Sequence, residues 1–246
     1  MGRKWQNIKL DKGKTDQQRG ALFTKLSKEI TLAAKGGSPD PESNHRLKLA
    51  VEKAREQNMP QDNIKRAIAR GTGGTGEKEI EELRYEGYGP HGLAVIVDAT
   101  TDNRNRTAGE LRFMFTKHGG TLGETGTVGW MFEPLGIVEV DPQGRSEDDL
   151  TEAALVEGVV DVDYSEDLTV VYTDLAQLAA VRDALRGPGL RVTDAYLGMR
   201  AKQTVAPEGA DLSAVLAFLD VLEAHEDVAR VFSNLDVSDA ALEALV

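Results

Sequence analysis

The chain has 246 residues, of which 40% are hydrophobic and 28% charged, with a net charge of −12 and no cysteine. This composition is typical of a folded globular protein, and the lack of cysteine excludes disulfides, thiolate zinc sites and cysteine nucleophiles. No apolar run approaches the roughly 20 residues that span a bilayer, so we expect a cytoplasmic protein without a membrane partner.

The charge is divided unevenly along the chain. Residues 1–71 hold 16 Lys and Arg against 8 Asp and Glu, a net charge of +8. Residues 72–246 hold the remaining 13 basic and 33 acidic residues, a net charge of −20. A basic N-terminal part on an acidic body favours a polyanionic partner for the basic part, and the alternative is that the charge serves solubility alone.

The N-terminal part is predicted to be helical. Residues 1–16 show no steady hydrophobic period and are rich in lysine, which predicts a mobile basic arm. Apolar residues then recur at helical spacing over 17–35 and 44–57, and a third helix is predicted within 58–71, with Pro60 near its start. We therefore expect a three-helix bundle over 17–71 with basic outward faces.

The stretch GTGGTG, residues 71–76, matches two phosphate-binding patterns by spacing alone. A dinucleotide-binding turn needs a strand before it and a helix after it, and a P-loop needs Lys and Ser or Thr after its last glycine. Here a predicted helix precedes the stretch and an acidic run follows it. We interpret Gly71 as the cap that ends the third helix and 72–76 as a flexible glycine linker, and we expect no nucleotide cofactor.

The rest of the chain alternates strands and helices. Strands are predicted on both sides of a Gly-Pro-Gly turn near residue 90, then a helix, and then a strand over 126–134 that ends at Pro134. Residues 135–202 follow the order β-α-β-β-α-β, which is the ferredoxin-like plan. We therefore predict an α+β protein with two ferredoxin-like α/β domains, one discontinuous (77–134 plus 203–246) and one inserted into it (135–202).

The segment TTDNRNRT, residues 100–107, lies between a predicted buried strand and the predicted helix that follows it. Arginine side chains bind phosphate in a bidentate manner, and a helix N-terminus adds a favourable dipole, so Arg104 and Arg106 are candidate phosphate contacts. The alternative is an ordinary helix cap at Asp102 or Asn103, with solvated arginines.

An enzymatic alternative rests on carboxylates in the same region. Asp98, Asp102 and Glu110 lie close in sequence, and a metal-dependent nuclease needs several carboxylates around one cleft. The four histidines are scattered, however, and no serine, histidine and aspartate have a recognisable catalytic context. We therefore expect no metal site, and the nuclease is the alternative to a binding protein.

The predicted nucleic-acid-binding residues are the cations of the arm and bundle together with Trp5, whose ring is available for stacking on bases. Phe23 lies on the apolar face of the first helix and is expected in the core. The full set is Arg3, Lys4, Trp5, Lys9, Lys12, Lys14, Arg19, Lys25, Lys28, Lys48, Arg55, Lys65, Arg66, Arg70, Arg104 and Arg106.

Several long motifs resemble the YebC/PmpR family, which includes mitochondrial translational activators of cytochrome oxidase. They are KWQNIK, RGALFTKLSKEI, NMPQDNIKRAIARGTGG, YEGYGPHGLAVIVDATTDNRNRT, KHGGTLGETGTVGWMF and VARVFSNLDV, in this order along essentially the whole chain. The resemblance implies a helical N-terminal domain, two α/β domains and a non-enzymatic role in gene expression. It also implies one of two partners: DNA, for a transcriptional regulator, or the ribosome and its RNA, for a translation factor acting at sequences such as proline runs.

Overall fold

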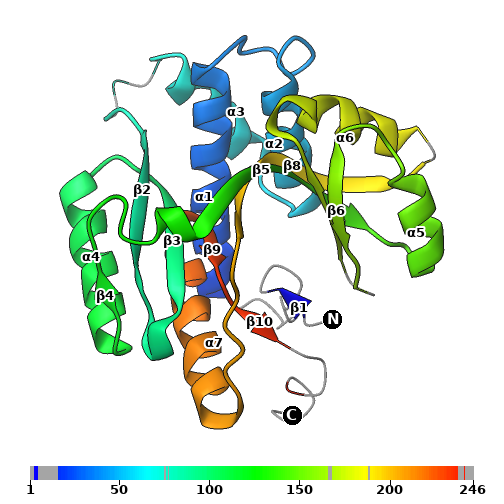
Figure 1. The fold of residues 1–246 in the computed structure, drawn as a ribbon. Coiled ribbons are helices and arrows are strands. Elements are labelled where there is room, and N and C mark those ends of the chain that lie inside the picture. The colour runs from blue at the N-terminus through cyan, green and yellow to red at the C-terminus, as the bar shows by residue number, and fades with distance from the viewer. Residues whose placement is uncertain are drawn as a thin grey trace.

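Three N-terminal helices pack around a small core of their own. The computed structural model describes residues 3–4, 16–74, 76, 78–165, 168–187, 189–237 and 241. The helices are α1 (Asp16–Lys35), α2 (His45–Glu56) and α3 (Gln61–Gly71), which confirms the prediction from helical spacing. Leu26, Ile30 and Val51 are among the side chains buried between them. In Figure 1 this bundle lies at the top and centre, with α1 running down the middle of the molecule.

The end of α3 differs from the prediction. Gly71 is the last residue of the helix, Thr72 is its C-cap, and Gly73 follows with φ of 79°, while the N–H groups of Gly73 and Gly74 donate to the carbonyls of Arg70 and Ala69. Gly71 has another reason to be glycine, because a Cβ there would lie 2.4 Å from the carbonyl oxygen of Thr31 on α1. The absence of a side chain therefore lets α3 pack closely on α1.

The first sheet has four antiparallel strands in the order β4-β2-β3-β9. Its strands are β2 (Glu81–Tyr88), β3 (Ala94–Thr101), β4 (Thr121–Leu122) and β9 (Val228–Ser233), and the short helix η2 (Pro90–Gly92) joins β2 to β3. Helices α4 (Arg104–Lys117) and α7 (Gly209–Ala224) cover one face of this sheet, where Val95 and Val97 pack against Phe115 and Phe218. Side chains alternate between the two faces of a strand, so Ile96 and Asp98 point away from α4 and α7.

The second sheet is also antiparallel, in the order β6-β7-β5-β8. It consists of β5 (Phe132–Asp141), β6 (Val159–Asp163), β7 (Thr169–Thr173) and β8 (Arg191–Ala201). Helices α5 (Glu147–Ala153) and α6 (Leu178–Arg186), the latter preceded by η4 (Leu175–Gln177), pack on one face through Leu150, Val181 and Leu185. The mixed α+β architecture with two four-stranded antiparallel sheets agrees with the predicted fold class.

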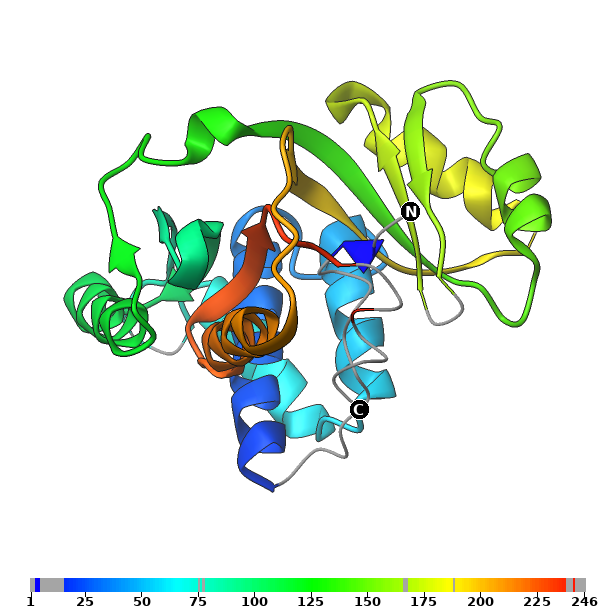
Figure 2. The same ribbon diagram turned by 60° about the horizontal axis from the view of Figure 1, so that its bottom comes forward.

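The prediction of a strand that ends at Pro134 was wrong. Residues 129–131 form a short helix, η3, and β5 begins at Phe132 and continues through Pro134. Pro134 faces Met199 of β8, whereas the pairing of β5 with β7 begins only at Gly136, so the missing proline N–H interrupts no hydrogen bond to β7. The boundary expected between residues 134 and 135 therefore falls inside a continuous strand, which Figure 2 shows running from the first sheet's side of the molecule to the second sheet.

The two sheets share a core on their facing sides. Ala94, Ile96 and Phe232 of the first sheet pack with Phe132 and Ile137 of β5 and with Tyr172 of β7 in one cluster. A Cβ at Gly198 of β8 would lie 3.2 Å from the ring of Phe232, which shows how closely the ribbon of β5 and β8 approaches the first sheet.

The N-terminal arm is described only in part. Arg3–Lys4 form the strand β1, which pairs antiparallel with β10 (Asp236–Val237). The predicted mobility of residues 1–16 otherwise concerns positions outside the described residues.

Candidate nucleic-acid interface

Two of the predicted cations face inward, from α1 towards the end of α7. The ammonium of Lys25 donates to the carbonyl of Glu223, and that of Lys28 donates to the carbonyl of Glu226 at 3.0 Å. Lys28 is buried and forms an ion pair with Asp227. Cations near a helix C-terminus complement the helix dipole, so both lysines dock α1 on the body.

Asp227 is the acceptor that also holds Arg106. Its side chain is fully buried, and Nη2 of Arg106 donates to both carboxylate oxygens at 3.1 and 2.8 Å. Thr107 donates to the same carboxylate at 2.7 Å. Burial alone would raise the pKa of Asp227, but the hydrogen bonds from Lys28, Thr107 and Arg106 outweigh burial and lower the pKa to about 2. Arg106, at the start of α4, therefore forms a structural ion pair with Asp227.

Arg70 and Lys48 are also engaged within the protein. Arg70, at the end of α3, donates to the carbonyl of Lys78 at 3.1 Å and lies 3.5 Å from Asp102. Lys48 forms an ion pair of 2.9 Å with Glu42, just before α2. An exposed pair of this kind contributes little to stability and opens readily, so Lys48 stays accessible to an anion in a way that Lys28 does not.

Four of the predicted cations are exposed and make no ion pair within the described part of the chain. These are Arg55 on α2, Lys65 and Arg66 on α3, and Arg104 at the start of α4. In α3 the opposite face is apolar and buried through Ile64 and Ala67, which fixes Lys65 and Arg66 on the solvent side. Ammonium and guanidinium groups in this position are suited to phosphate oxygens.

The remaining predicted contacts cannot be placed from the structure. Trp5, Lys9, Lys12 and Lys14 lie outside the described residues. Arg3 and Lys4 are described only as backbone in β1, and Arg19 only as a helical residue of α1.

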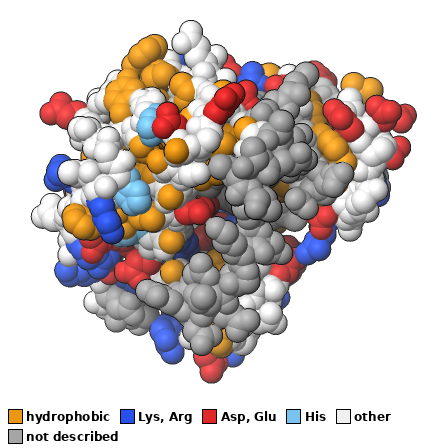
Figure 3. All heavy atoms as spheres, turned by 90° about the horizontal axis from the view of Figure 1, so that it is seen from below, with side chains coloured by type: hydrophobic (Ala, Val, Ile, Leu, Met, Phe, Trp, Pro, Cys, Tyr) orange, Lys and Arg blue, Asp and Glu red, His pale blue; other side chains and the backbone are white. Residues whose placement is uncertain are grey.

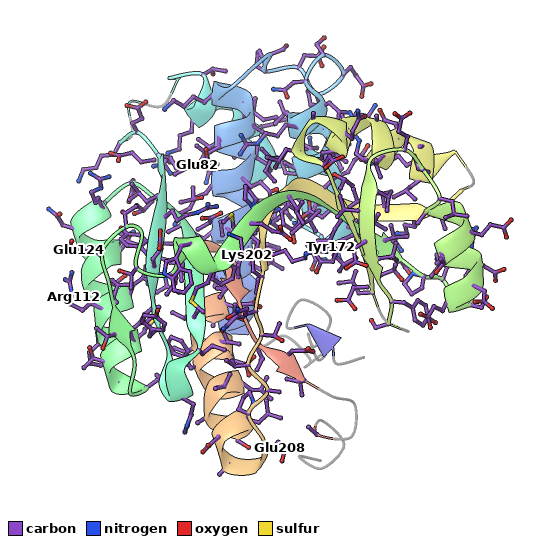
Figure 4. All side chains as sticks on the ribbon, in the orientation of Figure 1. Glu82, Arg112, Glu124, Tyr172, Lys202 and Glu208 are labelled. Carbon is purple, nitrogen blue, oxygen red and sulfur yellow. The ribbon has the colours of Figure 1, made fainter. Side chains whose placement is uncertain are left out.

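A hollow of about 580 Å³ lies between the bundle and the first sheet, close to Arg104. The bundle contributes the basic side chains Lys35 and Arg46 to its lining, and β2 contributes the acidic side chains Glu81 and Glu82. Arg46 and Glu82 are 3.0 Å apart across it, and Figure 4 shows Glu82 at the top of β2 beside α1. This exposed pair joins the basic bundle to the acidic body across the glycine linker.

The carboxylates of the nuclease alternative do not meet in one site. Asp98 accepts two hydrogen bonds from Arg84, of 2.6 and 2.8 Å, on the sheet face that points away from α4. Glu110 lies on α4, 2.9 Å from Nε2 of His225. Asp102 lies near Arg70 and shares with Glu110 the guanidinium of Arg106, which is 3.5 Å from Asp102 and 3.9 Å from Glu110. The geometry lends the nuclease alternative no support.

Glu110, His225 and Asp227 form the one carboxylate and histidine group among the described residues whose potential ligand atoms lie within 4.8 Å of one another. Each of the three residues already has partners: Lys28 and Arg106 bind Asp227, Nδ1 of His225 accepts from the N–H of Asp227 at 3.1 Å, and Nε2 of His225 lies 2.9 Å from Glu110. The two cations that already contact Asp227 would repel a metal ion. We therefore interpret this cluster as a structural hydrogen-bond network.

The surface charge is uneven within the acidic body itself, because α4 carries several basic side chains of its own. Figure 3 shows acidic side chains gathered at the right edge, over the second sheet's α5, and basic side chains on the left, over α4. The acidic residues at the start of α5 are Glu147, Asp148 and Asp149. Arg112 projects from the outer side of α4 in Figure 4. Within the described residues, no helix is long and apolar enough to cross a membrane.

Sequence reasoning missed Asp227, the most highly connected side chain of this region. Its partners Lys28 and Arg106 lie 199 and 121 positions away, so no local pattern pairs them. The available signal was the pair of acidic residues in HEDV, between a predicted helix and a predicted strand.

Comparison with known proteins agrees with this architecture. The chain matches the model of the TACO1/YebC protein N-terminal domain over residues 3–74 and that of the TACO1/YebC second and third domain over 80–235. A probable transcriptional regulatory protein from Herpetosiphon aurantiacus is 48% identical over 98% of this chain and 96% of its own length. One from Symbiobacterium thermophilum is 48% identical over 98% of this chain and 100% of its own.

A solved structure is similar throughout. The crystal structure of a conserved hypothetical protein from Aquifex aeolicus superposes with a TM-score of 0.87 and 42% identity, covering 96% of this chain and 97% of that one. The family models cover both the helical bundle and the two sheets, and the relatives match over nearly their full length. The chain therefore belongs to the TACO1/YebC family.

Proposed function

We propose that this protein regulates gene expression by binding nucleic acid through its N-terminal helices. The observation that carries the proposal is a set of exposed cations on two consecutive helices, Arg55 on α2 and Lys65 and Arg66 on α3, which form no ion pair with any residue that the structure describes. They belong to a segment with a net charge of +8 on a body with a net charge of −20. The names of the relatives, probable transcriptional regulatory proteins, support the same role.

The division of the cations suggests how the protein binds. Lys25 and Lys28 hold the bundle on the body and Arg106 is paired within the body, while Lys65, Arg66 and Arg104 remain available for phosphates. The acidic body repels the same backbone and thereby orients the molecule with its basic side towards the nucleic acid.

Two physiological partners fit this surface. Duplex DNA agrees with the names of the relatives, and ribosomal RNA agrees with a translation factor that relieves stalling at proline-rich sequences. Cationic contacts to phosphate are common to both and carry no sequence information. We propose DNA or ribosomal RNA as the partner class, and a direct comparison of probes separates the two.

The test measures the affinity of the full chain for duplex DNA, structured RNA and whole ribosomes at one near-physiological salt concentration. We expect at least one to bind, with an affinity that falls steeply with salt. In the double variant Lys65→Glu/Arg66→Glu the affinity falls at least 10-fold, and the salt slope decreases by about 1 for each phosphate that the protein no longer neutralises. Selective ribosome binding, with stalling at proline-rich messages in cells lacking the protein, identifies the translation role.

The matched control is Arg145→Glu, which makes the same kind of charge reversal just before α5, on the acidic body. We expect its affinity to change far less than that of the double variant. Negligible binding of all three probes, or an equal reduction of affinity in the two variants, overturns the proposal.

A further inference from the structure

The segment between β4 and β5 holds a tryptophan out to solvent. Trp130 in η3 is 66% exposed, although a side chain of this size gains much free energy from burial. Its indole N–H donates to the carbonyl of Thr127 at 3.2 Å, which orients the ring. The residue belongs to GTVGWMF, a motif that the interface described above does not use.

A buried carboxylate braces this segment. Glu86 of β2 accepts hydrogen bonds from the N–H groups of Val128 at 2.9 Å and Gly129 at 2.7 Å. Burial would raise the pKa of Glu86, but these backbone hydrogen bonds outweigh it and lower the pKa, so the carboxylate is charged. A Cβ at Gly129 would lie 3.1 Å from the carboxylate, so glycine allows the close approach. The segment that carries the tryptophan is therefore hydrogen-bonded to β2 of the first sheet.

A cation contacts the backbone of Trp130, and an aromatic ring lies near the neighbouring residue Met131. The ammonium of Lys202 donates to the carbonyl of Trp130 at 3.0 Å, and the N–H of Lys202 donates to that of Met131 at 2.9 Å. Figure 4 shows Lys202 at the centre of the molecule, next to η3. Tyr88 of β2 is 37% exposed, and its hydroxyl lies 3.9 Å from the sulfur of Met131.

We propose that Trp130 is a stacking platform for an unpaired nucleobase, with Lys202 placed for a phosphate of the same strand. The inference rests on the proposed function, since the basic helices supply the electrostatic attraction that the acidic body lacks. A flat, pre-oriented ring with a cation beside it suits a base and its backbone. An apolar peptide would instead need a large contiguous apolar patch.

Tryptophan fluorescence tests the proposal directly, because the chain has two tryptophans, Trp5 and Trp130. In Trp5→Phe the emission comes from Trp130 alone, and the probe is a single-stranded oligouridylate, which has no paired bases. We expect binding to quench this emission. Trp130→Ala should weaken binding about 5- to 150-fold, which is the range typical of replacing an aromatic side chain that stacks on one base by alanine. Trp130→Phe should retain part of the affinity.

Salt separates the two kinds of contact. Stacking releases no counterions, so the fold-reduction of affinity in Trp130→Ala should be the same at low and high salt, unlike that of Lys65→Glu/Arg66→Glu. The matched control is Leu155→Ala, just after α5, which removes a side chain that is 81% exposed but has no ring, and we expect its affinity to be unchanged.

The outcomes distinguish the platform from the proposed function. Oligouridylate that binds without quenching Trp130, and with wild-type affinity in Trp130→Ala, overturns the platform and leaves binding by the basic helices intact. A wild-type protein that binds no nucleic acid overturns both. If Trp130→Ala does not fold, the quenching in Trp5→Phe and the affinity of Trp130→Phe decide the matter.

Discussion

Asp227 joins α1, α4 and the start of β9 through one buried carboxylate. Asp227→Asn leaves Lys28 buried without a counter-charge, so we expect the free energy of unfolding to fall by about 3–5 kcal/mol at pH 7. Asp98→Asn is the matched control, because Asp98 also binds an arginine but lies in a more exposed pair, and it should cost at most about 1 kcal/mol. Urea unfolding of both variants measures the difference, and equal destabilisation contradicts a structural role for Asp227.

The pKa of Asp227 adds a dependence on pH to this prediction. The value is about 2 in the folded protein and 3.8 for an ordinary aspartate, so the charged carboxylate contributes stability above pH 4. That contribution, about 2 kcal/mol, is lost as the pH falls from 4 to 2. The stability difference between the wild type and Asp227→Asn should therefore shrink over this range. A difference that stays constant from pH 7 to pH 2 contradicts the assigned pKa.

Among the helices, two glycines, one at the end of α3 and one inside α4, should respond oppositely to the same substitution. Gly71 of α3 faces α1, and the Cβ of Gly71→Ala would lie 2.4 Å from the carbonyl of Thr31, so we expect a loss of about 1–3 kcal/mol. Gly109 of α4 has open space around it, so Gly109→Ala should stabilise the protein by about 0.5–1 kcal/mol through helix propensity. Thermal unfolding of the two variants gives the sign of each effect, and stabilisation by both would show that α3 does not need its close approach to α1.

The elements that the sequence predicts are those with local causes. Helices α1 to α3 follow from apolar spacing, and the hairpin of β2 and β3 follows from the Gly-Pro-Gly turn between two apolar runs. The segment 126–131 has strand-like residues, yet the N–H groups of Val128 and Gly129 bind Glu86, which lies about 40 positions away. The candidate interface could likewise be predicted only where its causes are local. The exposure of Lys65 follows from the helical period, whereas the ion pair of Lys28 depends on a residue far away in the sequence.

At the scale of the whole molecule, Asp194 of β8 connects the helical bundle with both sheets. Its carboxylate lies 2.9 Å from Lys53 of α2 and 2.9 Å from Arg230 of β9, whose guanidinium also stacks on Tyr196. Burial would raise the pKa of Asp194, but Arg230 and Lys53 outweigh it and lower the pKa, so the carboxylate is charged between two cations. One side chain thus links three parts of the chain that the glycine linker and the β5–β8 ribbon connect covalently.

Asp194→Asn should therefore lower the local stability of the bundle and of both sheets at the same time. It leaves Lys53 and Arg230 with uncompensated charge, and we expect a loss of about 3 kcal/mol in stability. Hydrogen exchange of the native protein should show faster exchange in α2, β8 and β9 at once, because the joint that orients the bundle on the body has been removed. Asp161→Asn is the control, since Asp161 pairs with Arg200 within the second sheet alone, and its effect should stay in that sheet. Faster exchange confined to β8 in Asp194→Asn would mean that the bundle is held by its other contacts, Lys28 with Asp227 foremost among them.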